Sequence, residues 1–492
     1  MEEGYMKSIR LVFGVASVAL LAACATRQSV DVSVDSDSLV FDPAVVRGEL
    51  KNGVSFLIRE NARPQGRVEL RLVVNAGSVL ERDPQQGLAH FLEHMAFNGT
   101  EHFAKNELVS YLESLGVAFG PDLNAYTSFD ETVYMLQVPT EDPAIIESAF
   151  QILADWAGGM SLTPEEIDKE RGVVIEEWRG RRGARQRIRD IQFSILLKDS
   201  LYAERLPIGK KAVLDSFDHN DLRAFYRDWY RPELMTVIAV GDVDSSRLKD
   251  LIHKYFTPLD ANTDTTGRPI MPVPDQPDRR ISIVTDPEAT TTSVSAYYLC
   301  PADSLTSRSD YRTRMRDGLF TTMLSLRFKE LARSDAPPFL NAYAYKGDFV
   351  RSKGAFVLGA DVKDGGVERG LDAVLAEAER LKRFGFTEGE LERARAMRLR
   401  RAKSAYAERA KTESSTLARK YVSSVTSGDV SAGVEAELKM HEEMLGQIAL
   451  EEMNPLVEAW ITDSNCVVLV SAPERKGEAM PTEADLEAIF KA

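Results

Sequence analysis

The chain has 492 residues, enough for two domains that each bury a hydrophobic core without help from disulfide bonds. Its formal net charge is -15. A net acidic surface repels nucleic acid and anionic membranes, so the charge argues against a general nucleic-acid or membrane-surface binder and favours a hydrated globular protein.

The first 24 residues are typical of a secretory signal. Lys7 and Arg10 precede an apolar run from Leu11 to Ala23 that is too short for a permanent membrane span. The run ends in Leu21-Ala22-Ala23-Cys24, which resembles a bacterial lipobox and implies that Cys24 is lipidated. An ordinary secretory signal near a cysteine is the alternative. Both place the protein in the periplasm, and Ala25 favours an anchor in the outer membrane.

Alternating strands and helices are predicted in the first half, after a tether rich in Ser, Asp and Val at residues 25–40. Asn52-Gly53 lies between apolar runs and predicts a hairpin turn. We expect residues 41–257 to form one domain. In this domain the run 122–134 alternates small, aromatic and β-branched residues, which predicts a strand.

The pentapeptide His90-Phe91-Leu92-Glu93-His94 carries the strongest chemical signal. On a helix, positions 90, 93 and 94 fall within roughly 100° of arc, so the three side chains leave one face. Two imidazoles can then bind a metal while Glu93 reaches its water. The order H-x-x-E-H is the inverzincin motif of metallopeptidases. A buried helix with two hydrogen-bonded core histidines is the alternative.

A catalytic zinc usually takes three protein ligands, so the two histidines leave one ligand to be found. The predicted helix 164–182 offers candidates. Glu170 and Glu177 are seven residues apart and share a helical face, whereas Glu176 points roughly 100° away from Glu177. Periodicity favours the pair without saying which glutamate binds metal. A solvated helix face is the alternative.

The end of this helix and the residues after it are rich in arginine. This arginine group either attracts acidic peptides or forms a solvated helix face. Its members are Arg179, Arg181, Arg182, Arg185, Arg187 and Arg189.

The second half, after a proline-rich linker at residues 258–280, repeats the plan of the first. Leu162-Thr163-Pro164 and Phe386-Thr387-Glu388 both open long charged helices, and each half ends in an apolar strand followed by a helix. We expect an α+β fold of two homologous α/β-sandwich domains, each an antiparallel-rich sheet packed by helices, with residues 281–492 as the second. Coincidental likeness of amphipathic helices is the alternative.

The two halves differ in their chemistry. The second half has no histidine between His253 and His441, so it cannot carry an equivalent two-histidine helix. Cys300 and Cys466 lie in apolar, strand-like stretches. An oxidising compartment would permit a disulfide between them, and two buried thiols are the alternative.

Residues 90–100 and the Glu170/Glu177 pair resemble the pitrilysin/insulinase family of zinc peptidases, and the chain looks like the N-terminal half of its long, PqqL-like bacterial members. The resemblance implies that Glu177 is the third ligand of one zinc ion per chain. It places Glu170 beside the site as a supporting carboxylate, in the catalytic group with Glu93, the general base. Two imidazoles and a carboxylate suit zinc.

The resemblance also implies a substrate site at the strand within residues 122–134. In the family, the matching strand pairs with an extended peptide by strand addition, which gives sequence-tolerant affinity for unfolded peptides. Asn124 and Ala125 are expected nearest the peptide. A sheet strand without a substrate role is the alternative.

A partner is implied as well. Active family members enclose substrate between two such double-domain units, and the unit opposite the zinc supplies an Arg and a Tyr in a pattern like L-R-E-x-x-G-x-x-Y. The nearest stretch here, residues 328–339, has Ala332 in the arginine position. We expect a zinc-less sister subunit in a heterodimer, with a homodimer as the other possibility. A non-catalytic peptide-binding, structural or scaffolding subunit is the rival function.

Overall fold

The computed structural model describes residues 37–491 apart from 106, 181–182, 262–266, 476 and 478. The predicted signal, Cys24 and most of the tether lie outside the described residues, as do Arg181 and Arg182. Leu39 already belongs to the folded body, because its backbone N–H donates to Thr306 O at 2.9 Å. No helix in the described ranges combines the length and apolarity that crossing a bilayer requires.

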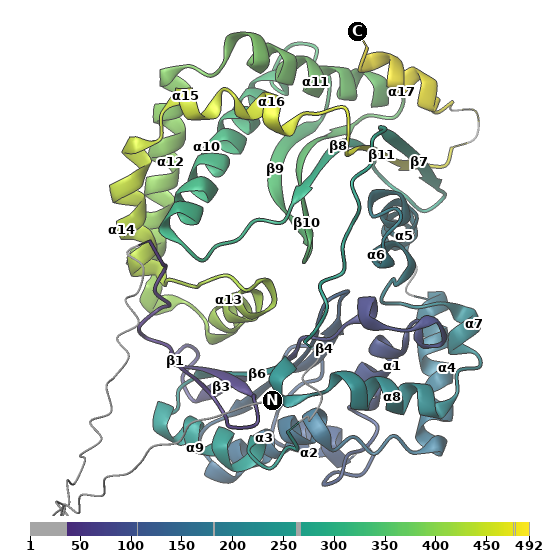
Figure 1. The fold of residues 1–492 in the computed structure, drawn as a ribbon, viewed down its shortest axis with the longest axis vertical. Coiled ribbons are helices and arrows are strands. Elements are labelled where there is room, and N and C mark those ends of the chain that lie inside the picture. The colour runs from purple at the N-terminus through teal and green to yellow at the C-terminus, as the bar shows by residue number, and fades with distance from the viewer. Residues whose placement is uncertain are drawn as a thin grey trace, which may run out of the picture. The chain divides into compact units, whose positions relative to one another are not determined.

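Two sheets organise the body (Figure 1). The first has the order β1-β2-β6-β3-β5-β4, and the second has the order β7-β11-β8-β10-β9. The strands of the first sheet are β1 Val46–Glu49, β2 Ser55–Glu60, β3 Arg67–Val74, β4 Leu123–Thr127, β5 Thr132–Pro139 and β6 Met235–Gly241. Those of the second are β7 Arg280–Asp286, β8 Thr292–Pro301, β9 Asn341–Val350, β10 Lys353–Val362 and β11 Cys466–Pro473.

The helices of the first half lie on and near the first sheet, apart from α5, which contacts the second sheet. They are α1 Leu88–Met95, α2 Glu107–Ser114, α3 Pro143–Gly158, α4 Pro164–Gly180, α5 Ala184–Leu196, α6 Leu201–Glu204, α7 Lys211–Leu214, α8 His219–Trp229 and α9 Ser245–Phe256. Short 3-10 turns lie at Ser78–Leu80, Asp83–Gln85 and Pro232–Leu234. The predicted Asn52-Gly53 hairpin joins β1 to β2, with Gly53 at φ +100°.

The second half has its own set of helices. They are α10 Arg308–Leu331, α11 Val367–Phe384, α12 Glu388–Ala407, α13 Ser414–Ser427, α14 Val434–Met444, α15 Leu450–Met453, α16 Leu456–Trp460 and α17 Glu483–Ile489. Further 3-10 turns lie at Arg409–Lys411 and Leu445–Gln447.

The two sheets share one topology, which confirms the duplicated α+β fold. In the first, β6 pairs in parallel with β2 and antiparallel with β3, and β5 joins β3 to β4. In the second, β11 pairs in parallel with β7 and antiparallel with β8, and β10 joins β8 to β9. Only β1 has no counterpart among the described strands. The exact domain limits stay a prediction.

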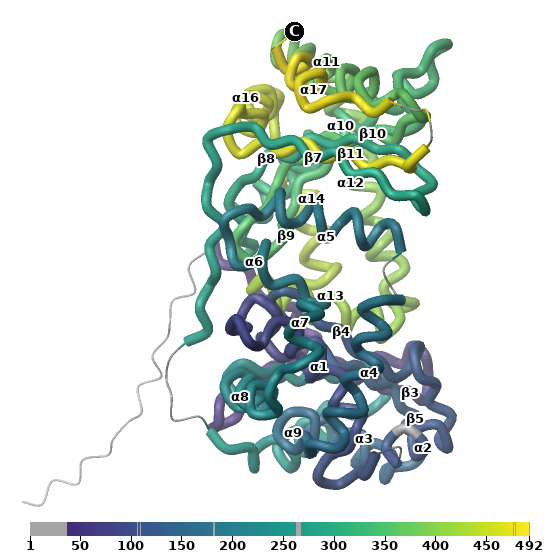
Figure 2. The backbone as a smooth tube through the Cα atoms, turned by 90° about the vertical axis from the view of Figure 1, so that its right-hand side faces the viewer, coloured from purple at the N-terminus to yellow at the C-terminus, as the bar shows by residue number. Residues whose placement is uncertain are grey.

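Each sheet buries a second face against a helix from the other half. Val73, Val133 and Ile238 of the first sheet form a buried cluster with Ala418 and Tyr421 of α13. Conversely, α5 contacts β7 and β11 of the second sheet, and Figures 1 and 2 both show it beside them. The two halves are therefore held together by an exchange of helices.

The run 122–134 is two strands rather than the single strand that alternation predicted. Residues 128–131 form the turn between β4 and β5, and Ser128 N–H donates to Glu131 O at 2.8 Å. Alternation is a local signal that continues through a tight turn, so it did not reveal the reversal. The consequence is that β4 ends beside the turn, at the edge of the sheet.

Both cysteines expected in strands are there, and they are not bonded to each other. Cys300 lies in β8 and Cys466 begins β11, where it pairs with Tyr298. Both are thiols, and Cys466 is fully buried. The alternative of two buried thiols therefore describes this structure for Cys466, whereas Cys300 is a thiol that is only partly buried.

Candidate metal centre

The helix α1 presents the pentapeptide as its periodicity predicts. Leu88, Ala89, Phe91, Leu92 and Met95 are buried in the core, whereas the side chains of the other three motif residues stand on the partly exposed face. The apolar face fixes the rotation of the helix. The two imidazoles and the carboxylate therefore leave it together.

A buried carboxylate sets where α1 begins. Glu81 Oε2 accepts the N–H of Gly87 at 2.9 Å, and Oε1 accepts the N–H of Ala89 at 2.8 Å. These N–H groups belong to the first turn, which has no partner within the helix. Gly87 has φ +104°, and a Cβ there would lie 2.9 Å from the Cα of Gly209. A glycine is therefore required at this helix start.

The helix α4 brings the third candidate ligand to this face. Its buried residues Ile167, Glu170 and Val174 pack toward α1, and Glu177 follows one turn later, partly buried. Glu176 points to solvent and pairs with Arg179 at 2.6 Å. Packing of α4 thus selects Glu177 over its neighbour.

His90, His94 and Glu177 converge, with one ligand atom from each all within 4.8 Å of one another. His94 Nε2 lies 3.2 Å from Glu177 Oε2, and His90 Nε2 lies 3.8 Å from Glu177 Oε1. Ligand atoms about 2.0–2.1 Å from a tetrahedral zinc lie roughly 3.4 Å apart. The donor set and its spacing therefore fit zinc. That they bind it stays a prediction.

Glu170 contacts His94 at the ring nitrogen that faces away from Glu177. Its Oε1 is hydrogen-bonded to His94 Nδ1 at 2.9 Å, which leaves Nε2 directed at Glu177. Asn98 Nδ2 donates to the other oxygen of Glu170 at 2.7 Å. A carboxylate on the far nitrogen of a ligating histidine orients the ring and raises its basicity. The supporting role of Glu170 in zinc binding stays a prediction.

The charges of the site favour a protonated His94 when no metal is bound. Burial disfavours the imidazolium, but the hydrogen bonds to Glu170 and Glu177 outweigh it and raise the pKa of His94 to about 9. Burial likewise works against ionised Glu170, but the bonds from His94 and Asn98 hold its pKa below the usual value. The two residues behave as an ion pair.

Glu93 has a hydroxyl partner that the sequence did not suggest. Thr127, at the end of β4, donates its hydroxyl proton to Glu93 Oε2 at 2.6 Å. Thr127 and Asn98 both contact the site, and neither had been given a role. Asn98 was detectable in principle, since it lies four residues after His94, just past the end of α1, whereas Thr127 lies 34 residues from Glu93.

The arginine group is more structural than either sequence interpretation allowed. Arg187 of α5 makes ion pairs with Asp286 and Glu288 near the end of β7, at 2.7 and 2.8 Å. It thereby links α5 to the second sheet. Arg179 is half exposed and pairs with Glu176 of its own helix. Among the described members, Arg187 is therefore part of the packing between the halves.

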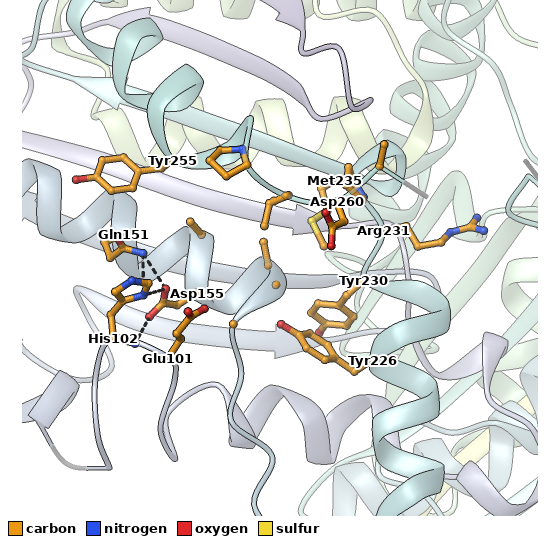
Figure 3. A pocket seen from close by; sticks show the side chains of 18 of the residues that line it. Glu101, His102, Gln151, Asp155, Tyr226, Tyr230, Arg231, Met235, Tyr255 and Asp260 are labelled. Atoms are coloured by element: carbon orange, nitrogen blue, oxygen red, sulfur yellow. Dashed lines mark hydrogen bonds and ion pairs between the residues drawn. The ribbon is translucent and has the colours of Figure 1, made fainter. Parts of the chain in front are cut away.

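Another hollow lies away from the triad and involves His102 (Figure 3). The cavity measures about 800 Å³ and is lined by α3, α8 and α9 together with the segments that follow them. His102 Nδ1 lies 2.8 Å from Asp155 Oδ1, and Thr100 donates its hydroxyl proton to Asp155 Oδ2. Asp155 therefore anchors the segment that follows α1. The candidate zinc ligands His90, His94 and Glu177 are not among the residues that line this cavity.

Known protein families match both halves. Residues 57–199 match insulinase (peptidase family M16), and residues 216–398 match the peptidase M16 inactive domain. The first match contains the whole metal triad. The second begins in the first half, before α8, and ends within α12 of the half that has no two-histidine helix.

Curated relatives share much of the sequence. A zinc protease PQQL-like protein of Arabidopsis thaliana is 33% identical over 87% of this chain, and a probable zinc protease PqqL of Haemophilus influenzae is 28% identical over 92%. These alignments cover 42% and 48% of the relatives. The chain spans about half the length of the curated relatives it matches.

A solved structure agrees with the fold over nearly all of its length. The first half of the periplasmic protease PqqL from Escherichia coli superposes with a TM-score of 0.86 at 27% identity. The match covers 92% of this chain and 97% of that one. The similarity thus extends across both sheets.

We expect Glu170→Gln to weaken zinc binding by about 10- to 100-fold, because an amide on Nδ1 raises the basicity of the ligating His94 less than a carboxylate does. Competition with a chromophoric chelator measures the zinc Kd. The matched control is Glu176→Gln, the same change at the exposed position of α4. Equal Kd values for the two variants would contradict the role of Glu170.

The raised pKa of His94 predicts a pH dependence in the metal-free protein. A raised folded-state pKa stabilises the fold fully below the ordinary value of 6.5, and this contribution is lost as pH rises through about 9. Because the ligand must be neutral, zinc binding near pH 7 should release the proton and tighten as pH rises. NMR titration of the His94 ring measures the pKa, and a midpoint near 6.5 would refute the prediction.

Proposed function

We propose that this chain, which belongs to the insulinase family of zinc proteases (peptidase family M16), is a zinc metalloendopeptidase. Its substrates would be unfolded peptides or small polypeptides. The observation that supports this proposal is the convergence of His90, His94 and Glu177 on one point, with Glu93 on the same helical face. A purely structural helix pair has no need to gather two imidazoles and three carboxylates.

In the proposed mechanism, His90, His94 and Glu177 would hold the zinc ion. When bound, zinc lowers the pKa of a water molecule and polarises a substrate carbonyl. Glu93 accepts the proton of the attacking water on its carboxylate and passes it to the leaving amine nitrogen. The Thr127 hydroxyl keeps that carboxylate oriented through its bond to Oε2.

Replacing Glu93 by Gln should leave zinc bound and lower peptide hydrolysis by at least about a hundredfold, since the general base is lost while the ligands are not. Metal analysis together with cleavage of an unstructured fluorogenic peptide tests both parts. Retained turnover would remove Glu93 from the mechanism. Wild-type protein that binds zinc but never cleaves would favour the rival, a peptide-binding subunit without catalysis.

The open edge of the first sheet offers the place for an extended peptide. Among the described strands, β4 pairs with β5 alone. Gln137 N–H donates to Asp122 O at 2.7 Å, and bonded pairs alternate with unbonded pairs along an antiparallel ladder. The N–H and C=O of Ala125 therefore point away from β5, and the Asn124 side-chain oxygen accepts that N–H at 2.9 Å.

A peptide added to this edge would pass the carboxylate of Glu93. Ala125 and Thr127 stand on the same side of β4, two residues apart, and Thr127 contacts Glu93. Ala125 would supply backbone hydrogen bonds to the peptide. Asn124, whose own backbone bonds go to β5, would contribute its exposed side chain, which shields the Ala125 N–H until a peptide replaces it. Backbone pairing explains tolerance of sequence.

Ala125→Pro tests this geometry, because proline removes one edge N–H and an edge strand tolerates it. We expect KM for an unstructured peptide to rise roughly two- to tenfold, the effect of one hydrogen bond, with zinc content unchanged. Steady-state kinetics with metal analysis provides the measurement. An unchanged KM would place the peptide elsewhere.

We further propose that full activity needs a second double-domain unit. Relatives about twice as long support this, as does Ala332, which follows α10 where the family pattern has an arginine. A zinc-less sister subunit would supply the Arg and Tyr in a heterodimer, and a second copy of the chain is the other source. Adding the partner should raise kcat. Full turnover by the isolated monomer would contradict the proposal.

We place the protein in the periplasm, held by a lipid on Cys24, more specifically at the outer membrane. Support comes from the lipobox-like sequence and from the similarity to PqqL of Escherichia coli, which is a periplasmic protease. Labelled palmitate that is incorporated into the wild type but not into a Cys24→Ala variant would support the anchor; equal labelling would exclude it.

A further inference from the structure

The second half holds arginines at the place that corresponds to the metal triad. The helices α4 and α12 start alike: Glu166 N–H donates to Thr163 Oγ1 and Glu390 N–H donates to Thr387 Oγ1, both at 3.4 Å. The two threonines therefore mark equivalent positions. Counting from them, Glu170 corresponds to Ala394, Val174 to Arg398 and Glu177 to Arg401.

Duplication has thus inverted the charge of the site. In the first half, α4 presents two carboxylates to α1. In the second half, α12 lies beside α10 and α14 (Figure 1). It carries Arg398 and Arg401 instead, and both line a pocket together with residues of α14. A position built for a cation has become one that suits an anion.

Arg398 lies in a space that a glycine leaves open. A Cβ on Gly318 of α10 would come within 2.1 Å of Arg398 Nη1 and 2.7 Å of its Cζ. The guanidinium therefore occupies the room that any other residue at position 318 would fill. Contact with a helix backbone removes water from one side of the charge.

The charge of Arg398 is not balanced by a carboxylate in the part of the chain that the structure describes. Its Nε is buried without a hydrogen-bond partner there. Tyr311 and Arg401 both influence the pKa of Arg398, and the second of these is itself cationic. A partly buried guanidinium without a counter-charge costs free energy unless something compensates it.

A pocket of about 220 Å³ opens at this guanidinium. Glu437, the one carboxylate in its lining, is bound by Lys420 Nζ at 2.6 Å. His441 Nδ1 lies 2.7 Å from the Glu437 carbonyl oxygen, and burial lowers the pKa of this histidine, so it is neutral at pH 7. The lining consists of Arg398, Arg401, Ala402, Ala405, Val434, Glu437, Leu438 and His441.

We propose that this pocket binds a small oxyanion, a phosphate group or a carboxylate, through Arg398 and Arg401. The planar guanidinium matches two oxygens of such a group at once, and the two cations face one carboxylate that is already paired. The anion supplies the missing counter-charge of Arg398. The inference is independent of peptidase activity, because it concerns a different half of the chain.

Binding of inorganic phosphate and of acetate to the full chain, at constant ionic strength, tests the proposal by calorimetry. Arg398→Met should weaken the Kd at least about tenfold, the effect of a lost charge-assisted bond. Arg400→Met is the matched control, since Arg400 is exposed on the same helix and does not line the pocket. It should change the Kd less than about twofold.

A second variant guards against a folding defect. Gly318→Ala favours the helix and keeps every charge, but its methyl group displaces the Arg398 guanidinium. It should also weaken binding. Phosphate binding alone identifies a phosphate group as the ligand, and acetate binding alone identifies a carboxylate. If neither phosphate nor acetate binds, or if Arg398→Met and Arg400→Met weaken the Kd equally, the proposed anion site would be refuted.

Discussion

The exchange of helices between the halves is the constraint that joins the two sheets. A sheet with one uncovered apolar face would leave Val73, Val133 and Ile238 in water, and α13 of the second half covers them. The reciprocal helix, α5, comes after α4, the helix that carries Glu170 and Glu177, and it contacts β7 and β11 of the second sheet. The part of the chain that carries the candidate ligands is therefore followed by a helix that packs on the other half.

Within that framework, a short chain of polar contacts gives the site its order. Asn98 holds Glu170, Glu170 holds His94, and His94 faces Glu177. Each member is partly or fully buried, so each bond forms at lower dielectric than at the surface and is correspondingly stronger. Among its described residues, the second half does not have this series of polar contacts, and it has arginines at the corresponding positions of α12 instead. The duplicated scaffold thus carries opposite charges at equivalent places without a change of topology.

Sequence reasoning succeeded where the signal was periodic and local. The helical face of the H-x-x-E-H motif, the hairpin at Asn52-Gly53 and the repeated plan of the two halves all follow from spacing along one element. It failed at the turn at residues 128–131, where an alternating pattern continued across a chain reversal. It also missed Thr127 and the ion pairs of Arg187, because their partners lie 34 and about 100 residues away.

The sequence by itself determined which functional groups are available for a metal site. These are two imidazoles and a carboxylate on one helical face and a glutamate pair on another helix, with no second set of histidines. These facts depend only on the identity of residues and on the 3.6-residue period of a helix. Tertiary structure decided which groups meet. The choice of Glu177 over Glu176, the contact of Glu170 with His94 and the contact of Thr127 with Glu93 depend on how α4 and β4 pack against α1. That packing is set by the burial of apolar faces from distant parts of the chain, which no local spacing encodes.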